Sequence, residues 1–105
     1  MLVIVTSGEK DKTKAMIGLN LALHSNVETK VILFGESEKL AASGDKDIDS
    51  LLEGLRNKNI LPIACQNIAD SANIREKLME LKIDLKPISS VITDFLGKGY
   101  IPVTF

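Results

Sequence analysis

The stretch LVIVTSGEKDKTKAMIGLNLAL, residues 2–23, shows the pattern that the rest of the chain repeats. Residues 2–6 form a short, nearly continuous β-branched run, which is typical of a strand buried on both faces. A polar loop follows at 7–12, and from 14 to 25 the apolar residues recur at helical spacing. Thr13 is placed to cap that helix. The start of the chain therefore predicts one strand–loop–helix unit.

The same alternation continues through the chain. The other predicted strands are, in order, 30–35, 60–64, 83–88 and 100–105. The other predicted helices are a single turn at 36–41, a helix that carries Ile48, Leu51, Leu52 and Leu55 and runs out at 57–59, the segment 67–81, and the segment 89–99. This order predicts an α/β fold, with a mostly parallel sheet and helices on both faces, in a single domain over residues 1–105.

Individual residues indicate where these elements begin and end. Asp47 or Asp49 is expected to cap the helix that follows the polar stretch near residue 45, and Ser89 or Ser90 the last helix. Pro62 has no N–H to donate to a ladder, so a strand start, a bulge or an edge position is expected for it.

Asparagine and glycine residues indicate helix ends in the second half of the chain. Asn73 is the expected break within 67–81, and Gly97 or Gly99 is the expected end of the last helix.

Composition excludes several kinds of protein. The 105 residues contain 13 basic and 14 acidic side chains, a net charge of -1, which provides no field for nucleic acid or an anionic membrane. No apolar run approaches the roughly 20 residues that span a bilayer. The apolar run begins directly after Met1 with no basic leader, so a cytoplasmic location is expected. With one cysteine, Cys65, and one histidine, His24, neither a disulfide within the chain nor a cysteine or histidine metal cluster is expected.

Familiar enzyme motifs are missing from the loops. The loop at 8–14 lacks the second glycine of a phosphate-binding P-loop, and no GxGxxG occurs. Cys65 stands where a phosphorylation receiver has its aspartate, and Ser71 stands where a cysteine phosphatase has its arginine. There is no GxSxG elbow. We therefore expect no hydrolase, kinase or NAD-dependent enzyme, and no cofactor or metal.

In a parallel sheet, ligands bind beyond the carboxyl ends of the strands. The segments 7–12, 35–37 and 65–70 are expected to converge there, with Cys65 as the reactive residue. A thiolate at a helix start is stabilised by free backbone N–H groups, and one cysteine is enough to hold sulfur as a persulfide. Alternatively, Cys65 is a packing residue, as free cysteines often are. The predicted loop neighbours of the site are Ser7, Gly8, Gly35, Gln66 and Asn67.

The segments IACQNIADSANI (63–74) and PISSVITDFLGKGYIPVTF (87–105), together with 2–23, resemble the DsrE/DsrF-like family. The most specific features are the cysteine after the third strand and the glycine–tyrosine pair at 99–100. The family includes the sulfur-relay subunits DsrE and TusD, and the chain is similar to its small bacterial and archaeal members of unknown function. Relay members often have an Arg-Gly-Ile-like run where this chain has residues 72–74.

The resemblance implies a three-layer α/β/α sandwich with a five-stranded, mainly parallel sheet. It also implies a homo-oligomer, trimer or hexamer, and a sulfur carried as a persulfide on Cys65. The leading hypothesis is thus a small sulfur carrier, sulfurtransferase-like if active, that works with donor and acceptor proteins. The alternative is a binding or assembly module that holds a small anion or nucleotide, with Cys65 structural. Exposed sulfur favours the first and buried sulfur the second.

Overall fold

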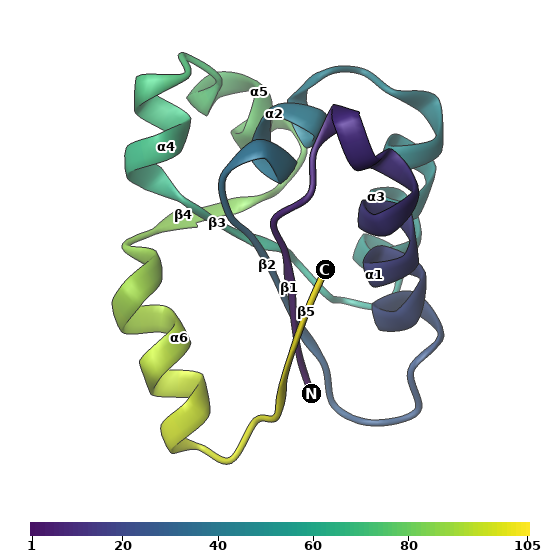
Figure 1. Ribbon diagram of the computed structural model, residues 1–105, viewed down its shortest axis with the longest axis vertical. Helices are drawn as coiled ribbons and strands as arrows, with labels where there is room; N and C mark the ends of the chain where they lie inside the picture. The colour runs from purple at the N-terminus through teal and green to yellow at the C-terminus, as the bar shows by residue number, and fades with distance from the viewer.

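Five short strands form one sheet in the computed structural model, which describes residues 1–105. The strands are β1 (Leu2–Val5), β2 (Lys30–Leu33), β3 (Ile63–Cys65), β4 (Asp84–Lys86) and β5 (Pro102–Thr104). Their order across the sheet is β4-β3-β2-β1-β5, and every neighbouring pair is parallel. The chain steps from strand to adjacent strand as far as β4 and then crosses back to place β5 beside β1 (Figure 1). The predicted α/β fold with a parallel sheet is confirmed.

Helices cover both faces of the sheet, as the sequence predicts. Their bounds are η1, a 3-10 turn (Glu9–Asp11), α1 (Lys12–His24), α2 (Glu36–Ala42), α3 (Lys46–Asn57), α4 (Gln66–Ser71), α5 (Arg75–Glu80) and α6 (Ile88–Gly97). In Figure 1, α1 and α3 lie on one side of the strands and α6 on the other, while α2, α4 and α5 gather near the carboxyl ends. None of these helices combines the length and the continuous apolar character that a membrane-spanning helix needs.

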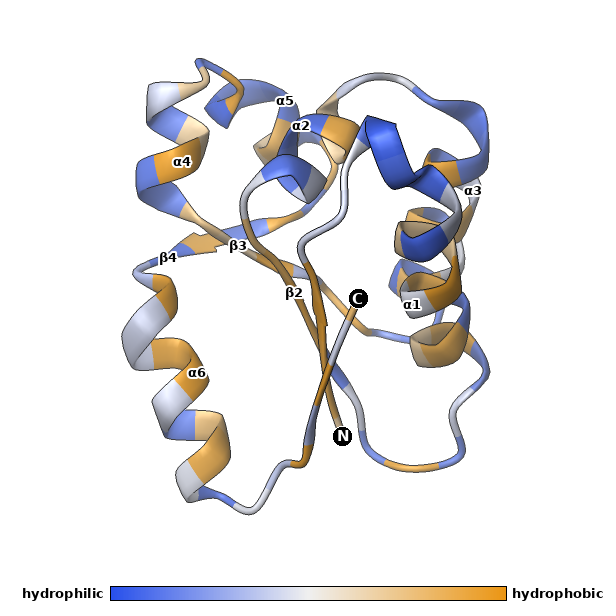
Figure 2. Cartoon of the chain, in the orientation of Figure 1, coloured by the Kyte–Doolittle hydropathy of each residue, from blue (hydrophilic) through white to orange (hydrophobic).

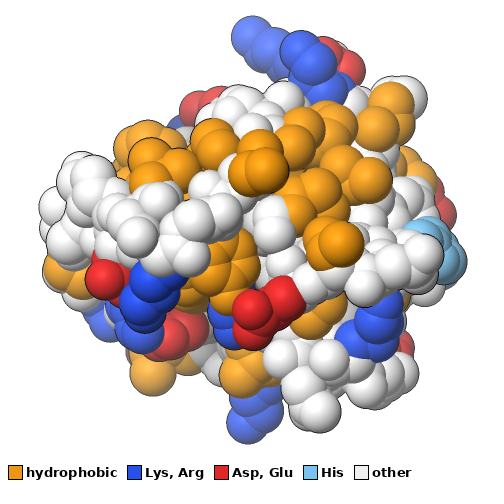
Figure 3. Space-filling view, turned by 90° about the horizontal axis from the view of Figure 1, so that it is seen from below, with side chains coloured by type: hydrophobic (Ala, Val, Ile, Leu, Met, Phe, Trp, Pro, Cys, Tyr) orange, Lys and Arg blue, Asp and Glu red, His pale blue; other side chains and the backbone are white.

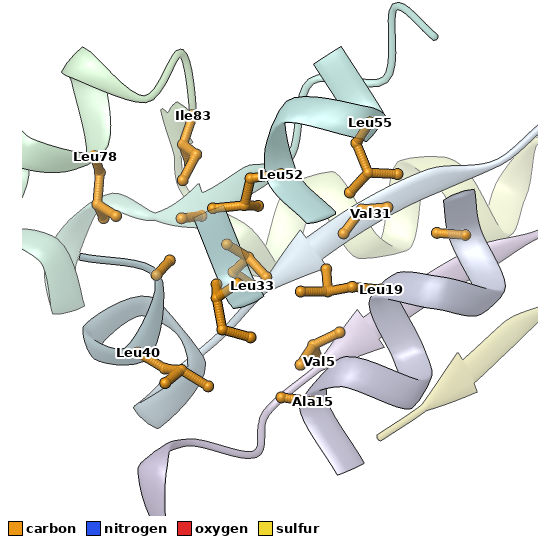
Figure 4. Close-up of a cluster of buried hydrophobic side chains, with 14 of the residues drawn as sticks. Val5, Ala15, Leu19, Val31, Leu33, Leu40, Leu52, Leu55, Leu78 and Ile83 are labelled. Carbon is orange, nitrogen blue, oxygen red and sulfur yellow. The ribbon is translucent and has the colours of Figure 1, made fainter. Parts of the chain in front are cut away.

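The larger core lies between the sheet and the helices α1 to α5. Val5, Val31 and Leu33 point from the central strands toward Leu19 of α1 and Leu52 of α3 (Figure 4). Figure 2 shows the central strands as continuous apolar runs, the pattern expected for strands buried on both faces. Alternate residues of each strand therefore point to opposite layers.

The smaller core lies on the other face, beneath α6. It consists of Leu2, Ile32, Ile63, Cys65 and Ile88, with partly buried side chains of α6 packed against it. Since this cluster depends chiefly on one helix, the second face has the thinner cover.

Two helices start differently from the expectation based on their capping residues. α1 begins at Lys12, one residue before Thr13, and Asp11 at its N-cap makes no side-chain cap. α6 begins at Ile88 after Pro87, so Ser89 and Ser90 lie inside its first turn and do not cap it. The prediction was wrong because proline already holds extended geometry before a helix.

The helix α3 is capped by Asp45, and neither Asp47 nor Asp49 holds that position. The Asp45 carboxylate accepts the N–H groups of Asp47 and Ile48 at 3.0 and 3.1 Å. It also lies 2.8 Å from the ammonium of Lys12, so this ion pair joins the N-terminus of α1 to the N-terminus of α3. The helix thus starts earlier than its apolar spacing indicates, because a tertiary contact favours the earlier aspartate.

Three other boundary predictions are confirmed. Asn73 adopts a left-handed φ of 58° and separates α4 from α5. Pro62 directly precedes β3, where no ladder donor is needed, and its carbonyl accepts the Asp84 N–H at 2.9 Å. Gly99 adopts a φ of 90° in the turn between α6 and β5.

Candidate functional site

Two of the three predicted loops meet at the carboxyl ends of β1 and β2. Gly8 lies so close to α2 that an added Cβ would stand 2.6 Å from the Cβ of Glu36. Ser37, in the first turn of α2, donates its hydroxyl to the carbonyl of Val5 at 2.5 Å and accepts the N–H of Phe34 at 2.9 Å. This buried hydroxyl joins the ends of two adjacent strands.

Glu38, the next residue, makes the corresponding connection between β2 and β3. Its side chain is fully buried, and its Oε2 accepts the N–H of Gly35 at 3.1 Å. Burial raises the pKa of Glu38 from 4.5 to about 7, while hydrogen bonds from the backbone amides of Gly35 and Cys65 oppose that rise. Its Oε1 is buried without a partner. A buried carboxyl group with a raised pKa thus lies beside the backbone amide of Cys65.

Cys65 is the last residue of β3 and the N-cap of α4. Its side chain is 7% exposed and packs in the smaller core with Leu2, Ile32 and Ile63. Its surroundings are therefore apolar, in contrast to the water-open loop that the polar neighbours indicate. The six residues of α4 also supply only a short dipole.

The predicted loop neighbours of Cys65 fall into two groups. Gln66 and Asn67 form the first turn of α4 beside it, and Gly35 reaches it through Glu38. Ser7 instead donates its N–H to the carbonyl of Phe105 at 3.2 Å. Gly8 stays with the start of α2. The site around Cys65 is thus built mainly from the ends of β2 and β3.

Two pockets lie near the ends of these strands. One, of about 310 Å³, is lined by Gly35, Glu36, Lys39, Ile68, Ser71 and Ala72. The other, of about 390 Å³, is lined by Gly8, Glu9, Lys10 and Glu36. The first has a mainly apolar surface, whereas no hydrophobic residue lines the second; both are of the size of a small ligand, and Cys65 lines neither. No group of three or more histidine, cysteine or acidic side chains is placed to hold a metal ion.

The opposite end of the molecule is more apolar. Figure 3 shows that end, where apolar side chains form a broad band across the surface. Segments 25–29 and 98–101 lie there in Figure 1 and contain the exposed Val27 and Ile101, 61% and 71% accessible. A pocket of about 270 Å³ includes Val27, Glu28 and Tyr100. Partial burial and the Glu28 carboxylate raise the pKa of Tyr100.

Sequence reasoning placed Ser37 in the converging segment 35–37 without giving it a role, and it missed Glu38. A usable signal was present, because a glutamate three residues after the glycine that ends a strand, followed by an apolar run, fits a capping box. That pattern predicts a helix start and a satisfied N–H. It does not predict that the glutamate is fully buried or that it reaches a neighbouring strand.

Comparison with known proteins gives a fold and no further identity. No protein-family model matches the chain, and no curated protein does. Two solved structures match it over nearly the whole length. The conserved protein of unknown function BT1422 from Bacteroides thetaiotaomicron is 24% identical, with a TM-score of 0.82 over 99% of this chain and 93% of that one. The ychN protein from E. coli is 18% identical, with a TM-score of 0.77 over 99% and 97%.

These two structures place the chain in a class of small α/β proteins with a single parallel sheet. At 24% and 18% identity they show the fold alone, and that fold is the one that the resemblance of residues 63–74 and 87–105 to the DsrE/DsrF-like family implies.

Proposed function

We propose that the protein is a sulfur carrier that holds a sulfane sulfur as a persulfide on Cys65. The observation that carries the proposal is the position of the one cysteine, which ends β3 and caps α4 at the carboxyl edge of a parallel sheet. The DsrE/DsrF-like fold supports it, because the sulfur-relay members of that family hold sulfur on the matching cysteine.

The carrier needs no cofactor for this chemistry. The Cys65 thiolate attacks the outer sulfur of a persulfide on a donor protein, and a new sulfur–sulfur bond forms as the donor's bond breaks. The donor leaves as a thiolate and takes up the proton that Cys65 gave up. The same exchange in reverse passes the sulfur to an acceptor protein, so no oxidant or reductant is consumed.

By the criterion of the sequence analysis the buried sulfur favours the alternative module, so the carrier requires that its partners open the layer over Cys65. A persulfide in the smaller core is shielded from water and from free thiols. Because α6 provides most of the cover and α4 carries only six residues, small movements of these helices expose Cys65 to a docked donor.

Intact mass spectrometry tests the proposal directly. The native protein, incubated with a persulfide donor, should gain the mass of one sulfur, and Cys65→Ser should gain none. Reduction should return the wild type to its original mass. Native protein that takes no sulfur, while the unfolded chain reacts normally, would overturn the carrier function.

One observation favours a second function, that of a binding or assembly module. Cys65 is 7% exposed in an apolar cluster, as a structural cysteine would be. The pocket of about 310 Å³ between α2 and α4 then holds the ligand, a small anion or nucleotide. Titration of the protein with such ligands, followed by NMR shifts of Gly35 and Ala72, distinguishes this function from the carrier.

We also propose that the chain forms a homo-oligomer, a trimer or hexamer. Large apolar side chains are exposed on α1 and beside β5, among them Ile17, Leu21 and Ile101, and β5 pairs on one side only. Association buries such surfaces. Gel filtration with light scattering that shows only monomer at micromolar concentration would contradict this.

A further inference from the structure

The strand β4 forms one of the two edges of the sheet and pairs only with β3. The Asp84 N–H donates to the carbonyl of Pro62 at 2.9 Å, and Leu85 lies in register with Ala64. Backbone groups alternate in direction along a strand, so the N–H and the carbonyl of Leu85 point away from β3. No strand lies on that side, and the edge therefore presents a free donor and a free acceptor.

The side chains of β4 give its two faces different characters. Asp84 and Lys86 point to the same face as Ile63 of β3, form an ion pair at 3.3 Å and are each half exposed. Leu85 points to the other face, where it packs against the larger core. One face of the edge thus carries an acid and a base, and the other face is apolar.

The apolar face of this edge extends beyond β4. Leu61, which lies before β3, and Met79 of α5 are 52% and 56% accessible, and both line a pocket of about 380 Å³ beside Leu85. The surface of this pocket is mainly apolar. Large apolar side chains gathered beside an unpaired strand are typical of a surface that another chain covers.

We propose that β4 is a contact between two copies of this chain, which pair antiparallel about a twofold axis at Leu85. The two sheets then join into one sheet of ten strands. The Leu85 N–H of each copy donates to the Leu85 carbonyl of the other, so the free backbone groups of both edges are satisfied. The pairing rests on the homo-oligomer proposed above and names one of its interfaces.

The charges on β4 are complementary to themselves in this arrangement. Asp84 of each copy lies directly opposite Lys86 of the other, and opposite charges in such cross-strand positions stabilise the pairing. A shift of two residues, the smallest that keeps the same faces together, places Asp84 opposite Asp84 or Lys86 opposite Lys86. Like charges would then face each other, so the sequence of β4 selects the register centred on Leu85.

The apolar face fits the same partner. Facing residues of antiparallel strands point to the same side, so the Leu85 side chains of the two copies lie next to each other. The second copy then covers the pocket formed with Leu61 and Met79. The other edge strand, β5, carries no charged side chain and begins with a proline, so it has no comparable complementarity.

Exchange of the charges tests the pairing without removing the strand. Asp84→Lys carries two lysines on the edge and Lys86→Asp carries two aspartates. Each variant alone should associate about tenfold more weakly than the wild type, because two attractive pairs become two repulsive ones. An equimolar mixture of the two variants should restore the wild-type association, since each lysine then faces an aspartate. Sedimentation velocity measures all three samples.

A matched control is available on α6. Asp94 forms an exposed ion pair with Lys98 at 3.0 Å, so Asp94→Lys reverses a comparable charge away from the edge and should leave association unchanged. Circular dichroism checks that each variant is folded.

A cross-link decides the question if a charge variant fails to fold. In a Cys65→Ser background, Leu85→Cys should form a disulfide between two chains on mild oxidation, because facing Cα atoms in such a pair lie about 5.5 Å apart. Ser50→Cys, exposed on α3, should form none. Absence of the link at position 85 would overturn the proposal.

Failures of the oligomer and of the β4 pairing have different signatures. A wild type that is monomeric at high micromolar concentration overturns both, and the edge is then left for an extended segment of another protein. A trimer that neither charge variant alters keeps the oligomer and overturns the pairing. Single variants that dissociate and do not recover on mixing also overturn it. A dimer or hexamer that the mixture restores supports the pairing.

Discussion

The cluster of buried residues on one face of the sheet has sixteen members, and the cluster on the other face has five. Five helices, α1 to α5, contribute buried residues to the first cluster, whereas α6 provides most of the cover of the second. Cys65 belongs to the smaller cluster. The cysteine therefore lies in the layer with the smaller buried core, which we expect to open at the lower free energy, while the stability of the fold depends mainly on the opposite layer.

The largest effect is expected from a cavity in the larger core. Leu52 is completely buried in α3, so Leu52→Ala should lower the free energy of unfolding by about 3–4 kcal/mol. Urea unfolding followed by circular dichroism measures this. A loss below about 1 kcal/mol would mean that the larger core does not hold the fold together.

A slightly smaller effect is expected from the charge of Glu38. Its pKa is about 7 in the folded protein against 4.5 ordinarily, so between these pH values the folded state binds more protons than the unfolded state. Stability should therefore fall as the pH rises from about 5 to 8, by up to about 3 kcal/mol. Urea titrations at several pH values check this. Glu38→Gln should flatten that dependence, and a slope that persists in the variant would assign it to other groups.

In the smaller core, Ile88→Ala should lower the free energy of unfolding by about 2 kcal/mol. The loss is smaller than for Leu52→Ala because fewer buried side chains surround Ile88, so the substitution removes fewer contacts. It should also speed labelling of Cys65 by iodoacetamide in native protein. Leu52→Ala serves as the control: its rate of Cys65 labelling is measured at a urea concentration chosen so that both variants have the same free energy of unfolding. Faster labelling in the Leu52 variant would contradict the assignment of Cys65 to the easily opened layer.

The smallest effect is expected in the turn that returns the chain from α6 to β5. Gly99 has a φ of 90°, which a β-branched residue adopts only with strain, so Gly99→Val should cost about 1–2 kcal/mol. Gly97, with open space around it and no positive φ, supplies the control Gly97→Ala. A melting temperature within a degree of the wild type for Gly99→Val would show that the turn tolerates side chains.

The regular features of the fold were predictable because they depend on local spacing. The β-branched runs at 2–6 and 30–35 became β1 and β2, and the strand–helix alternation indicated a parallel sheet. Asn73 and Gly99 were correctly predicted to end helices because asparagine and glycine adopt positive φ more readily than other residues, as both do here. Helix starts were predicted less well. Asp45 competes with Asp47 and Asp49 for the cap of α3, and its contact with Lys12 is not visible in local sequence.

The order of strands and helices and the place of the one cysteine at the end of the third strand could be predicted from the sequence, since both follow from residue type and period. Only the tertiary structure decided which way Cys65 points, that its thiol lies under α6, and that Glu38 is buried against its backbone. Burial depends on what packs from distant parts of the chain. From the sequence alone, Glu38 is expected to be an exposed helix residue. Its pKa is raised to about 7 only because α2 packs against the ends of β1, β2 and β3 and buries its side chain.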